Sequence, residues 1–565
     1  MKRINVLEIG AVADGKTSCS AVLQEVFNEN KCDFELYFPP GRYYMDKAVY
    51  VVGVDNCTMY GENAIILTHF TATGDKPENN NGFEFTNCHN LAVKNFTFTT
   101  DNHVNCIGRI VAIDVENTTY DVKIDDEFKM TGWEHLWGSD TFDEEGTPNY
   151  HLDTYDKILR EMVIDENGVE RQKISGVRYE LIGENLLRVD MSVWGESAHD
   201  LVSGLYIGER ILYRYIIYGN SVFMFADCHD VLLKDIEIER CSSMGARVNP
   251  PSSNFTFENF NIRLPKNAKT LYSANADGIH ILGLSGYLKM KDCTFVGLGD
   301  DALNIHGTAA RIEEIREDGA VQCLRKGVAL ENNWAKQGDV LIVYNAETLL
   351  EKGRLTLASY EDGYAVIDSS TGEYGVGDIL ANDAYFASVE LDNCEVRHTR
   401  ARGFLLQSRN VTVNNCRVYG MALPAIIVAP DLNYWYEVGP SDNVEIRNCH
   451  FEKCGHAPRN ANLGAVVVKA SHDAGFSDHP AGVHTNMRLI GNTFKNCGNS
   501  GIYVTATKGL EVRDNRFIEC CCDRFDNETP GTDYAISIRN SADIKVSDNV
   551  TDQGEAFLLH TYNCE

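Results

Sequence analysis

The chain has 565 residues, of which 44% are hydrophobic, and it carries a formal net charge of −31 at pH 7. Nucleic acids and anionic membranes require a basic binding surface, so this charge argues against both as partners and favours a neutral or weakly charged substrate. The N-terminus lacks the apolar core and cleavage site of a signal peptide, and no apolar run is long enough to cross a membrane, so we expect a cytoplasmic protein, or a secreted one if a leader was removed.

The N-terminal region, residues 1–104, predicts the entrance to a repeating β-structure. A helical stretch from Ser18 to Asn28 precedes apolar strands around residues 51–67 and 83–98. The segment from Gly10 to Thr17 matches the P-loop pattern. The strands that follow do not alternate with helices as a P-loop domain requires, so we interpret the segment as an Asp-Gly turn before a helix that caps the apolar core.

Two segments interrupt the repeat. Residues 105–217 and residues 308–384 alternate polar and apolar positions, which is typical of antiparallel strands, and each predicts an inserted β-barrel. The repeat occupies residues 218–307 between them and residues 385–565 after them. We leave open whether the inserted barrels form a homodimer contact.

Asparagines within short apolar strands mark the repeat. They are separated by 22, 33, 44, 23 and 34 residues and occur at Asn393, Asn415, Asn448, Asn492, Asn515 and Asn549. These gaps fit a unit of about 22 residues with insertions, which is typical of a solenoid of strands and turns. The sequence therefore predicts an all-β protein, a right-handed parallel β-helix of the pectin-lyase-like type with two inserted antiparallel β-barrels.

The 18 cysteines follow the same repeat. Cys293, Cys394, Cys416 and Cys449 each follow an Asn or Asp, which predicts stacked, buried thiols rather than disulfides and favours a reducing compartment. The Cys520–Cys522 run lacks the paired spacing of a zinc site. We expect no cofactor.

Two acidic motifs carry the chemistry. Asn275-Ala-Asp-Gly-Ile-His280 and Gly299-Asp-Asp-Ala-Leu-Asn-Ile-His-Gly307 lie 23 residues apart, close to one repeat. Coils of a β-helix stack about 4.8 Å apart, so Asp277, Asp300 and Asp301 are expected to share one patch. Clustered carboxyls split their pKa values, which provides the protonated acid and the ionised base that glycosidic hydrolysis needs. A structural ladder, or a calcium site as in lyases, is the alternative.

Further polar side chains are expected to surround these acids and to bind sugar hydroxyls. The candidates are Asn275, His280, Asn304, His306, Arg247, Asn249, Arg402, Gln407 and Trp435. Arginines near residue 400 are equally consistent with a solvated face, and the aromatic run Tyr434–Tyr436 with a cover for the solenoid rather than a sugar-stacking platform.

At these motifs the chain resembles glycoside hydrolase family 110, the exo-acting α-1,3-galactosidases. The two acidic motifs and Arg400-Ala-Arg-Gly403 carry the resemblance, which extends to two barrel insertions in the same places. It implies an inverting hydrolase that releases terminal α-1,3-linked galactose from blood-group B type glycans or linear digalactosides. By that likeness Asp300 is the general acid, and Asp277 with Asp301 activates the attacking water. Asp300 and Asp301 can face one cleft only if a turn or bulge intervenes.

The related polygalacturonases are the alternative family. They carry a Gly-His-Gly segment and an Arg-x-Lys pair that handle an anionic uronate, and neither occurs in order here. This difference favours a neutral galactoside. A glycan-binding β-helix without catalysis is the other alternative.

Overall fold

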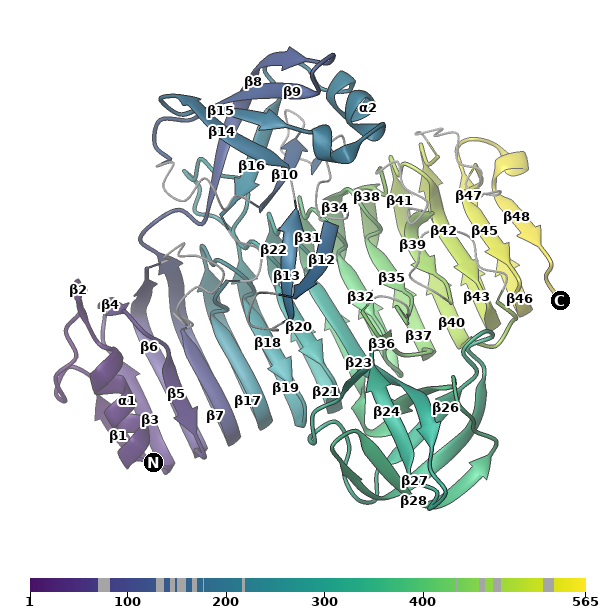
Figure 1. The fold of residues 1–565 in the computed structure, drawn as a ribbon, viewed down its shortest axis with the longest axis horizontal. Coiled ribbons are helices and arrows are strands. Elements are labelled where there is room, and N and C mark those ends of the chain that lie inside the picture. The colour runs from purple at the N-terminus through teal and green to yellow at the C-terminus, as the bar shows by residue number, and fades with distance from the viewer. Residues whose placement is uncertain are drawn as a thin grey trace.

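The computed structural model describes residues 1–69, 82–128, 177–215, 219–432, 435–456, 463–470, 479–521 and 533–565, together with four strands between residues 137 and 175. Tyr434, Cys522 and the end of the first predicted insertion lie outside the described residues. A long stack of parallel strands forms the body of the molecule, with the N-terminus at one end, the C-terminus at the other, and an antiparallel domain on either side (Figure 1). Within the described part of the chain, the helices are too short or too polar to span a bilayer.

The stack begins at a capping helix. Helix α1 (Ser20–Glu29) buries Leu23, Val26 and Phe27 against the first coil. The first strands are β1 (Lys2–Asn5), β2 (Asp14–Ser18), β3 (Cys32–Phe38), β4 (Gly41–Met45), β5 (Val49–Val52), β6 (Asp55–Thr68) and β7 (Phe83–Thr100). In the segment that matches a P-loop, Lys16 N and Thr17 N each donate a hydrogen bond to Asp14 Oδ1 at 2.8 Å, which is the predicted aspartate turn.

Each coil contributes to three parallel sheets, and the chain visits them in turn. The first sheet contains parts of β3, β6, β7, β17 (Phe223–Ile238) and β19 (Ser252–Ile262), followed by β21 (Leu284–Lys291), β30 (Phe386–Asp392), β33 (Val411–Asn414), β37 (Asp442–Arg447), β40 (His484–Ile490), β43 (Thr507–Arg513) and β46 (Ala542–Ser547). The second sheet contains β4, the ends of β6, β7, β17 and β19, then β22 (Thr294–Val296), β31 (Glu395–Arg397), β34 (Arg417–Met421), β38 (His450–Cys454), β41 (Thr493–Lys495), β44 (Arg516–Ile518) and β47 (Val550–Thr551).

The third sheet forms the floor of the site described below. It contains β5, the starts of β7 and β17, then β18 (Ala246–Asn249), β20 (Ile279–Leu282), β23 (Leu303–Ile315), β32 (Phe404–Leu406), β35 (Ile426–Val428), β39 (Gly464–Val468), β42 (Ser500–Thr505), β45 (Ile536–Arg539) and β48 (Leu559–Tyr562). A short 3-10 turn, η6 (Glu555–Phe557), precedes β48.

The repeating asparagines have two structural roles. Asn393, Asn415 and Asn448 adopt positive φ angles of 53°, 54° and 55° at the corner between the first and second sheets. Asparagine accepts this left-handed conformation more readily than most residues, which explains its recurrence. In the later coils Asn492 and Asn515 are buried, and the Nδ2 atoms of successive asparagines donate along an internal ladder, for example Asn515 Nδ2 to Asn549 Oδ1 at 2.9 Å.

Stacked cysteines line the core beside this corner. Cys293, Cys394, Cys416 and Cys449 are all buried free thiols, as the repeat predicted. Their Sγ atoms donate to carbonyl oxygens of the adjacent strands, for example Cys416 Sγ to Leu391 O at 3.8 Å. The thiols therefore fill repeated small positions in the apolar core.

The first insertion is an antiparallel, barrel-like sheet around its own core. Its strand order is β11 (Pro148–Asn149), β10 (Trp137–Phe142), β16 (Arg210–Arg214), β8 (Asn105–Asp114), β9 (Thr119–Ile124), β15 (Leu186–Asp190) and β14 (Arg178–Gly183). A hairpin of β12 (Leu159–Ile164) and β13 (Glu170–Ser175), a 3-10 turn η4 (Ser192–Trp194) and helix α2 (Ser197–Ser203) complete its elements.

The second insertion is a closed antiparallel barrel. Its elements are β24 (Val321–Arg325), β25 (Val328–Ala329), β26 (Val340–Tyr344), β27 (Glu351–Glu361), β28 (Tyr364–Gly372), β29 (Ile379–Asn382) and η5 (Asp383–Tyr385). Strand pairing runs from β23 through β24, β28, β27, β26 and β29 back to β23, so the ring closes. Strand β23 is therefore both the third-sheet strand of one coil and a strand of the barrel. The two insertions confirm the predicted fold class.

Candidate active site

The outward face of the third sheet brings most of the predicted site residues together. Strand residues alternate between the two faces, and Leu303 and Ile305 point into the core. The register places Arg247, His280 and Asn304 side by side on β18, β20 and β23. Three positions predicted from separate motifs therefore form one row across neighbouring coils.

The three aspartates lie at the turn that leads from the second sheet into the third. Asp277 precedes β20, and Asp300 and Asp301 precede β23. One carboxylate oxygen from each lies within 4.8 Å of the others. Asp300 and Asp301 both reach the cluster because they occupy a turn and not a strand, which meets the geometric condition set by the sequence.

Burial and mutual repulsion shift the protonation of this triad. Burial, reinforced by the charge of Asp300, raises the pKa of Asp277 well above its usual range. Burial also raises the pKa of Asp301 to about 7, against the opposing effect of the Arg402 guanidinium. The triad therefore retains a proton near neutral pH, which is the state that general acid catalysis requires.

Arg402 holds Asp301 in place from the next coil. Its backbone N donates to Asp301 Oδ1 at 3.0 Å, and its Nε donates to the same oxygen at 2.8 Å. Asp301 Oδ2 is buried and makes no hydrogen bond to another protein group in the described structure. The aspartate thus has one anchored oxygen and one enclosed oxygen without a protein donor.

A chain of hydrogen bonds links Asp277 to the two histidines. His280 Nδ1 lies 3.3 Å from Asp277 Oδ2, and His280 Nε2 lies 3.1 Å from His306 Nε2. His306 Nδ1 donates to Gly307 O at 2.9 Å. Burial lowers the pKa of both histidines, so both rings are neutral near pH 7. Because Gly307 O can only accept, His306 Nε2 must accept from His280 Nε2. His280 Nδ1 then accepts from protonated Asp277, so the hydrogen bonds run from Asp277 to His280 to His306.

Glu437 is a site residue that the sequence did not reveal. It lies in β36 (Glu437–Val438), which pairs antiparallel with Gly307 and Thr308 of β23. Glu437 Oε1 lies 3.5 Å from His306 Nε2, and Gln407 Nε2 donates to Glu437 Oε2 at 3.3 Å. Burial raises the pKa of Glu437. The charge of Arg402, the charges that His306 and His280 carry in the acid range where Glu437 titrates, and a hydrogen bond from Asn304 outweigh burial and bring the pKa of Glu437 below its usual value.

The segment that carries Glu437 leaves the repeat, which is why spacing could not locate it. It departs after β35 and returns two coils earlier along the third sheet, to β23. Asp431 N donates to Glu437 O at 2.9 Å and Glu437 N donates to Asp431 O at 2.8 Å. We call residues 429–432 and 435–439 the strap. Its only sequence signal is an unusually long connection between two short strands.

Asn275 is a correction, because the structure places it beneath the site and not in contact with a sugar. It is fully buried. Its Nδ2 donates to Val104 O at 2.8 Å, and Asn105 Nδ2 donates to its Oδ1 at 3.0 Å. Arg214 Nη1 donates to the carbonyl oxygens of Asn275 and Gly299 at 3.0 Å each. Asn275 therefore anchors the first insertion to the catalytic coils.

The remaining candidates lie at the margins. Arg247 and Asn249 lie on β18, one coil before His280. Arg247 Nε donates to Asn249 Oδ1 at 3.1 Å. Gln407 is fully buried against the strap. Trp435 is half-buried, with Lys326 Nζ 5.7 Å from its ring centroid. The sugar-stacking role of Trp435 stays a prediction.

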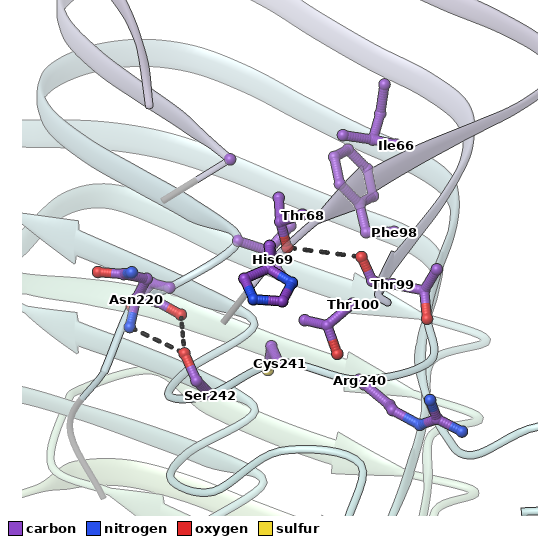
Figure 2. Close-up of a pocket in the computed structure, with 13 residues that line it drawn as sticks. Ile66, Thr68, His69, Phe98, Thr99, Thr100, Asn220, Arg240, Cys241 and Ser242 are labelled. Atoms are coloured by element: carbon purple, nitrogen blue, oxygen red, sulfur yellow. Dashed lines mark hydrogen bonds between the residues drawn. The ribbon is translucent and has the colours of Figure 1, made fainter. Parts of the chain in front are cut away.

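A small pocket lined by both polar and apolar side chains lies next to the aspartates, toward the N-terminus. Figure 2 shows His69, Asn220, Arg240 and Ser242 around it, with Ser242 hydrogen-bonded to Asn220. Cys241 also lines this pocket, and its backbone forms a parallel β-bridge with Ala274 on the coil that carries Asp277. The pocket therefore lies one coil from the triad along the same turn.

Among the described residues, two groups of side chains have the atoms to hold a cation. The ligand atoms of His280, His306 and Glu437 lie within 4.8 Å of one another, as do those of the three aspartates. Arg402 already supplies positive charge to the aspartates, and the 3.1 Å contact between the histidines is satisfied by one N–H.

These features define a β-helical protein with an acid triad in the turns that lead into one sheet. A family model described as "Right handed beta helix region" matches residues 327–476, in agreement with the predicted handedness. Among solved structures, a family 28 exopolygalacturonase from Yersinia enterocolitica is similar with a TM-score of 0.48 at 12% identity, covering 100% of this chain and 77% of that one.

The curated relatives are more specific. "Alpha-1,3-galactosidase B" of Bacteroides thetaiotaomicron is 22% identical over 553 residues, 92% of this chain and 86% of the relative. "Alpha-1,3-galactosidase A" of Shewanella woodyi is 23% identical over 76% of this chain and 69% of the relative. "Alpha-1,3-galactosidase A" of Akkermansia muciniphila is 28% identical over 51% of this chain and 48% of its own length. These comparisons confirm the resemblance to the α-1,3-galactosidases and the enzyme class, a glycoside hydrolase.

Proposed function

We propose that the chain is an inverting exo-α-1,3-galactosidase that releases terminal galactose from an oligosaccharide or glycan. The triad of Asp277, Asp300 and Asp301 is the observation that carries the proposal, because its carboxyl oxygens lie within 4.8 Å of one another and burial of Asp277 and Asp301 favours a proton among them. Hydrolysis of a glycosidic bond uses these two states together. The similarity to curated α-1,3-galactosidases supplies the sugar and the linkage.

In the proposed mechanism Asp300 protonates the leaving oxygen, and Asp277 and Asp301 orient and deprotonate the water. Asp300 is the most exposed of the three, so it is best placed to reach the leaving group. The proton that burial favours on Asp277 must then move to Asp300 when the sugar binds. Coupled carboxyls titrate as a group, so this transfer needs no change in the total number of protons.

The stereochemistry is part of the proposal and has its own test. Inverting enzymes generally separate their carboxyls by about 6.5–9.5 Å and retaining enzymes by about 5–5.5 Å, whereas the closest oxygens here lie within 4.8 Å. Proton NMR of released galactose at early times decides the matter. β-Galactose from α-1,3-galactobiose supports inversion, and α-galactose refutes it.

Leaving-group dependence tests the assignment of the acid. α-Galactosyl fluoride needs no proton on departure, so Asp300→Asn should hydrolyse the fluoride far better than galactobiose relative to the wild type. Asp301→Asn should lose both activities, because it removes a base. Equal losses on both substrates for Asp300→Asn refute its role as acid. If the wild-type protein releases galactose from neither a linear α-1,3-galactoside nor a blood-group B trisaccharide, the proposed function is wrong.

A further inference from the structure

We propose that Glu437 is a specificity-determining residue that makes the site accept a neutral, hydroxyl-rich sugar and reject a uronic acid. This inference rests on the proposed hydrolase function and names the residue that sets its substrate class. Glu437 is carried by the strap to the outward face of the third sheet, next to His306 and Gln407.

The Glu437 carboxylate has a fixed position beside the third sheet. The Glu437 side chain is 11% exposed, and its backbone is held by β-pairing to β23 and by the bridge to Asp431. Gly439 approaches the Gln407 backbone so closely that an added Cβ would lie 2.7 Å from Gln407 O. The strap is therefore packed tightly on the coil, and the carboxylate has a fixed place.

Glu437 also imposes an orientation on two buried amides. A carboxylate only accepts hydrogen bonds, so Gln407 and Asn304 must turn their NH₂ groups toward it. Gln407 donates to Glu437 Oε2 at 3.3 Å, and Asn304 also donates to Glu437. Their oxygen atoms, Asn304 Oδ1 and Gln407 Oε1, are left without a hydrogen bond to another described protein group.

The group that the site presents to a ligand is the Glu437 carboxylate itself. Asn304 Oδ1, Gln407 Oε1 and Asp301 Oδ2 have almost no accessible surface, so they do not contact a ligand directly. The Glu437 side chain is 11% exposed and only accepts hydrogen bonds, so it favours a ligand hydroxyl beside it. A uronate carboxylate in that place provides no donor and meets the charge of Glu437.

A matched pair of substrates tests the proposal. α-Galactosyl fluoride and α-galacturonosyl fluoride differ only at C6, and neither needs an aglycone site. We expect the wild-type enzyme to prefer the galactosyl fluoride in kcat/KM by at least about 100-fold. In Glu437→Gln the new amide can donate or accept, so the neighbouring amides are free to turn. That variant should lose galactosyl turnover and narrow the preference by at least about tenfold.

Control variants separate this role from a general loss of structure. Glu390→Gln makes the same change on an exposed position of β30 and should leave the ratio unaltered. Asn304→Ser keeps the charge of Glu437 but removes an amide that donates to it and helps to hold it, so it should lower galactosyl turnover without improving turnover of the uronide. A thermal unfolding midpoint within a few degrees of the wild type shows that each variant is folded.

Two results overturn the proposal: an unchanged substrate ratio in folded Glu437→Gln, or a wild-type enzyme that prefers the uronide. Failure of the broader function gives a different result, in which the wild-type protein turns over neither fluoride. Saturation-transfer NMR with free galactose and galacturonate then still tests the inference, because galactose should bind to the wild type and galacturonate should not.

Discussion

Arg402→Met offers a quantitative test of how the catalytic aspartates are held. The substitution removes the 2.8 Å hydrogen bond from Arg402 Nε to Asp301 Oδ1 and the positive charge behind it, while the 3.0 Å backbone hydrogen bond remains. A hydrogen bond to a charged group contributes about 1.5–3 kcal/mol. Since one pKa unit corresponds to about 1.4 kcal/mol, losing it should raise the pKa of Asp301, about 7 in the intact site, by about one to two units.

The expected consequence is a shift of the pH profile rather than a uniform loss. If ionised Asp301 activates water, the acidic limb of kcat/KM moves to higher pH by the same one to two units. Activity at pH 7 should then fall by about fivefold to fiftyfold and recover partly at pH 9. The assay is kcat/KM for α-galactosyl fluoride across the pH range. Arg263→Met, which breaks an exposed pair with Glu237, is the matched control.

One result would refute this reasoning. If Arg402→Met lowers activity by the same factor at every pH and leaves the acidic limb in place, Arg402 does not act through the ionisation of Asp301. A direct contact of Arg402 with the sugar would then be the better explanation.

Three further predictions concern stability and metals. The pKa of Asp277 is raised in the folded state, so the protonated form stabilises the fold and this stability is lost as pH rises. Asp277→Asn should therefore raise the melting temperature at pH 8 but not near pH 4, where Asp277 is itself protonated. An equal rise in melting temperature at both pH values contradicts this link between the pKa of Asp277 and stability. Phe494 is buried between Phe451 and Phe517, with ring centroids 5.1 and 4.9 Å away. Phe494→Ala should therefore lower the free energy of unfolding, measured with denaturant, by about 3–5 kcal/mol. Thr493→Ala, at a half-buried position, is the control and should lower it little. EDTA treatment should leave galactosyl turnover unchanged, and recovery of lost activity by Ca²⁺ or Zn²⁺ would show that a cation does act in the site.

The repeat made much of the fold and the acid triad predictable. Residues one coil apart in sequence are neighbours in space, so a spacing of 23 residues between the motifs was enough to bring Asp277 together with Asp300 and Asp301. Strand alternation then placed His280 and Asn304 on the same outward face. Local periodicity carries this information because a solenoid coil contacts mainly its nearest neighbours.

What the sequence could not provide depends on segments that leave the repeat. Glu437 reaches the site because the strap folds back two coils, and no periodic signal encodes such a return. Asn275 was assigned to sugar binding because it lies in the acidic motif, but the first insertion covers it and uses its amide through Asn105. In both cases a contact between residues more than 100 positions apart decides the role.

The continuity of β23 from the catalytic coil into the second barrel restricts how this scaffold can be rebuilt. A separately folded domain on a flexible linker can be exchanged like a cassette. Here the same strand presents Asn304 and His306 to the site and then closes the barrel ring. A graft or a loop exchange must therefore transfer residues 303–382 as one piece, whereas coils toward the C-terminus can be added or removed without cutting a strand of the site.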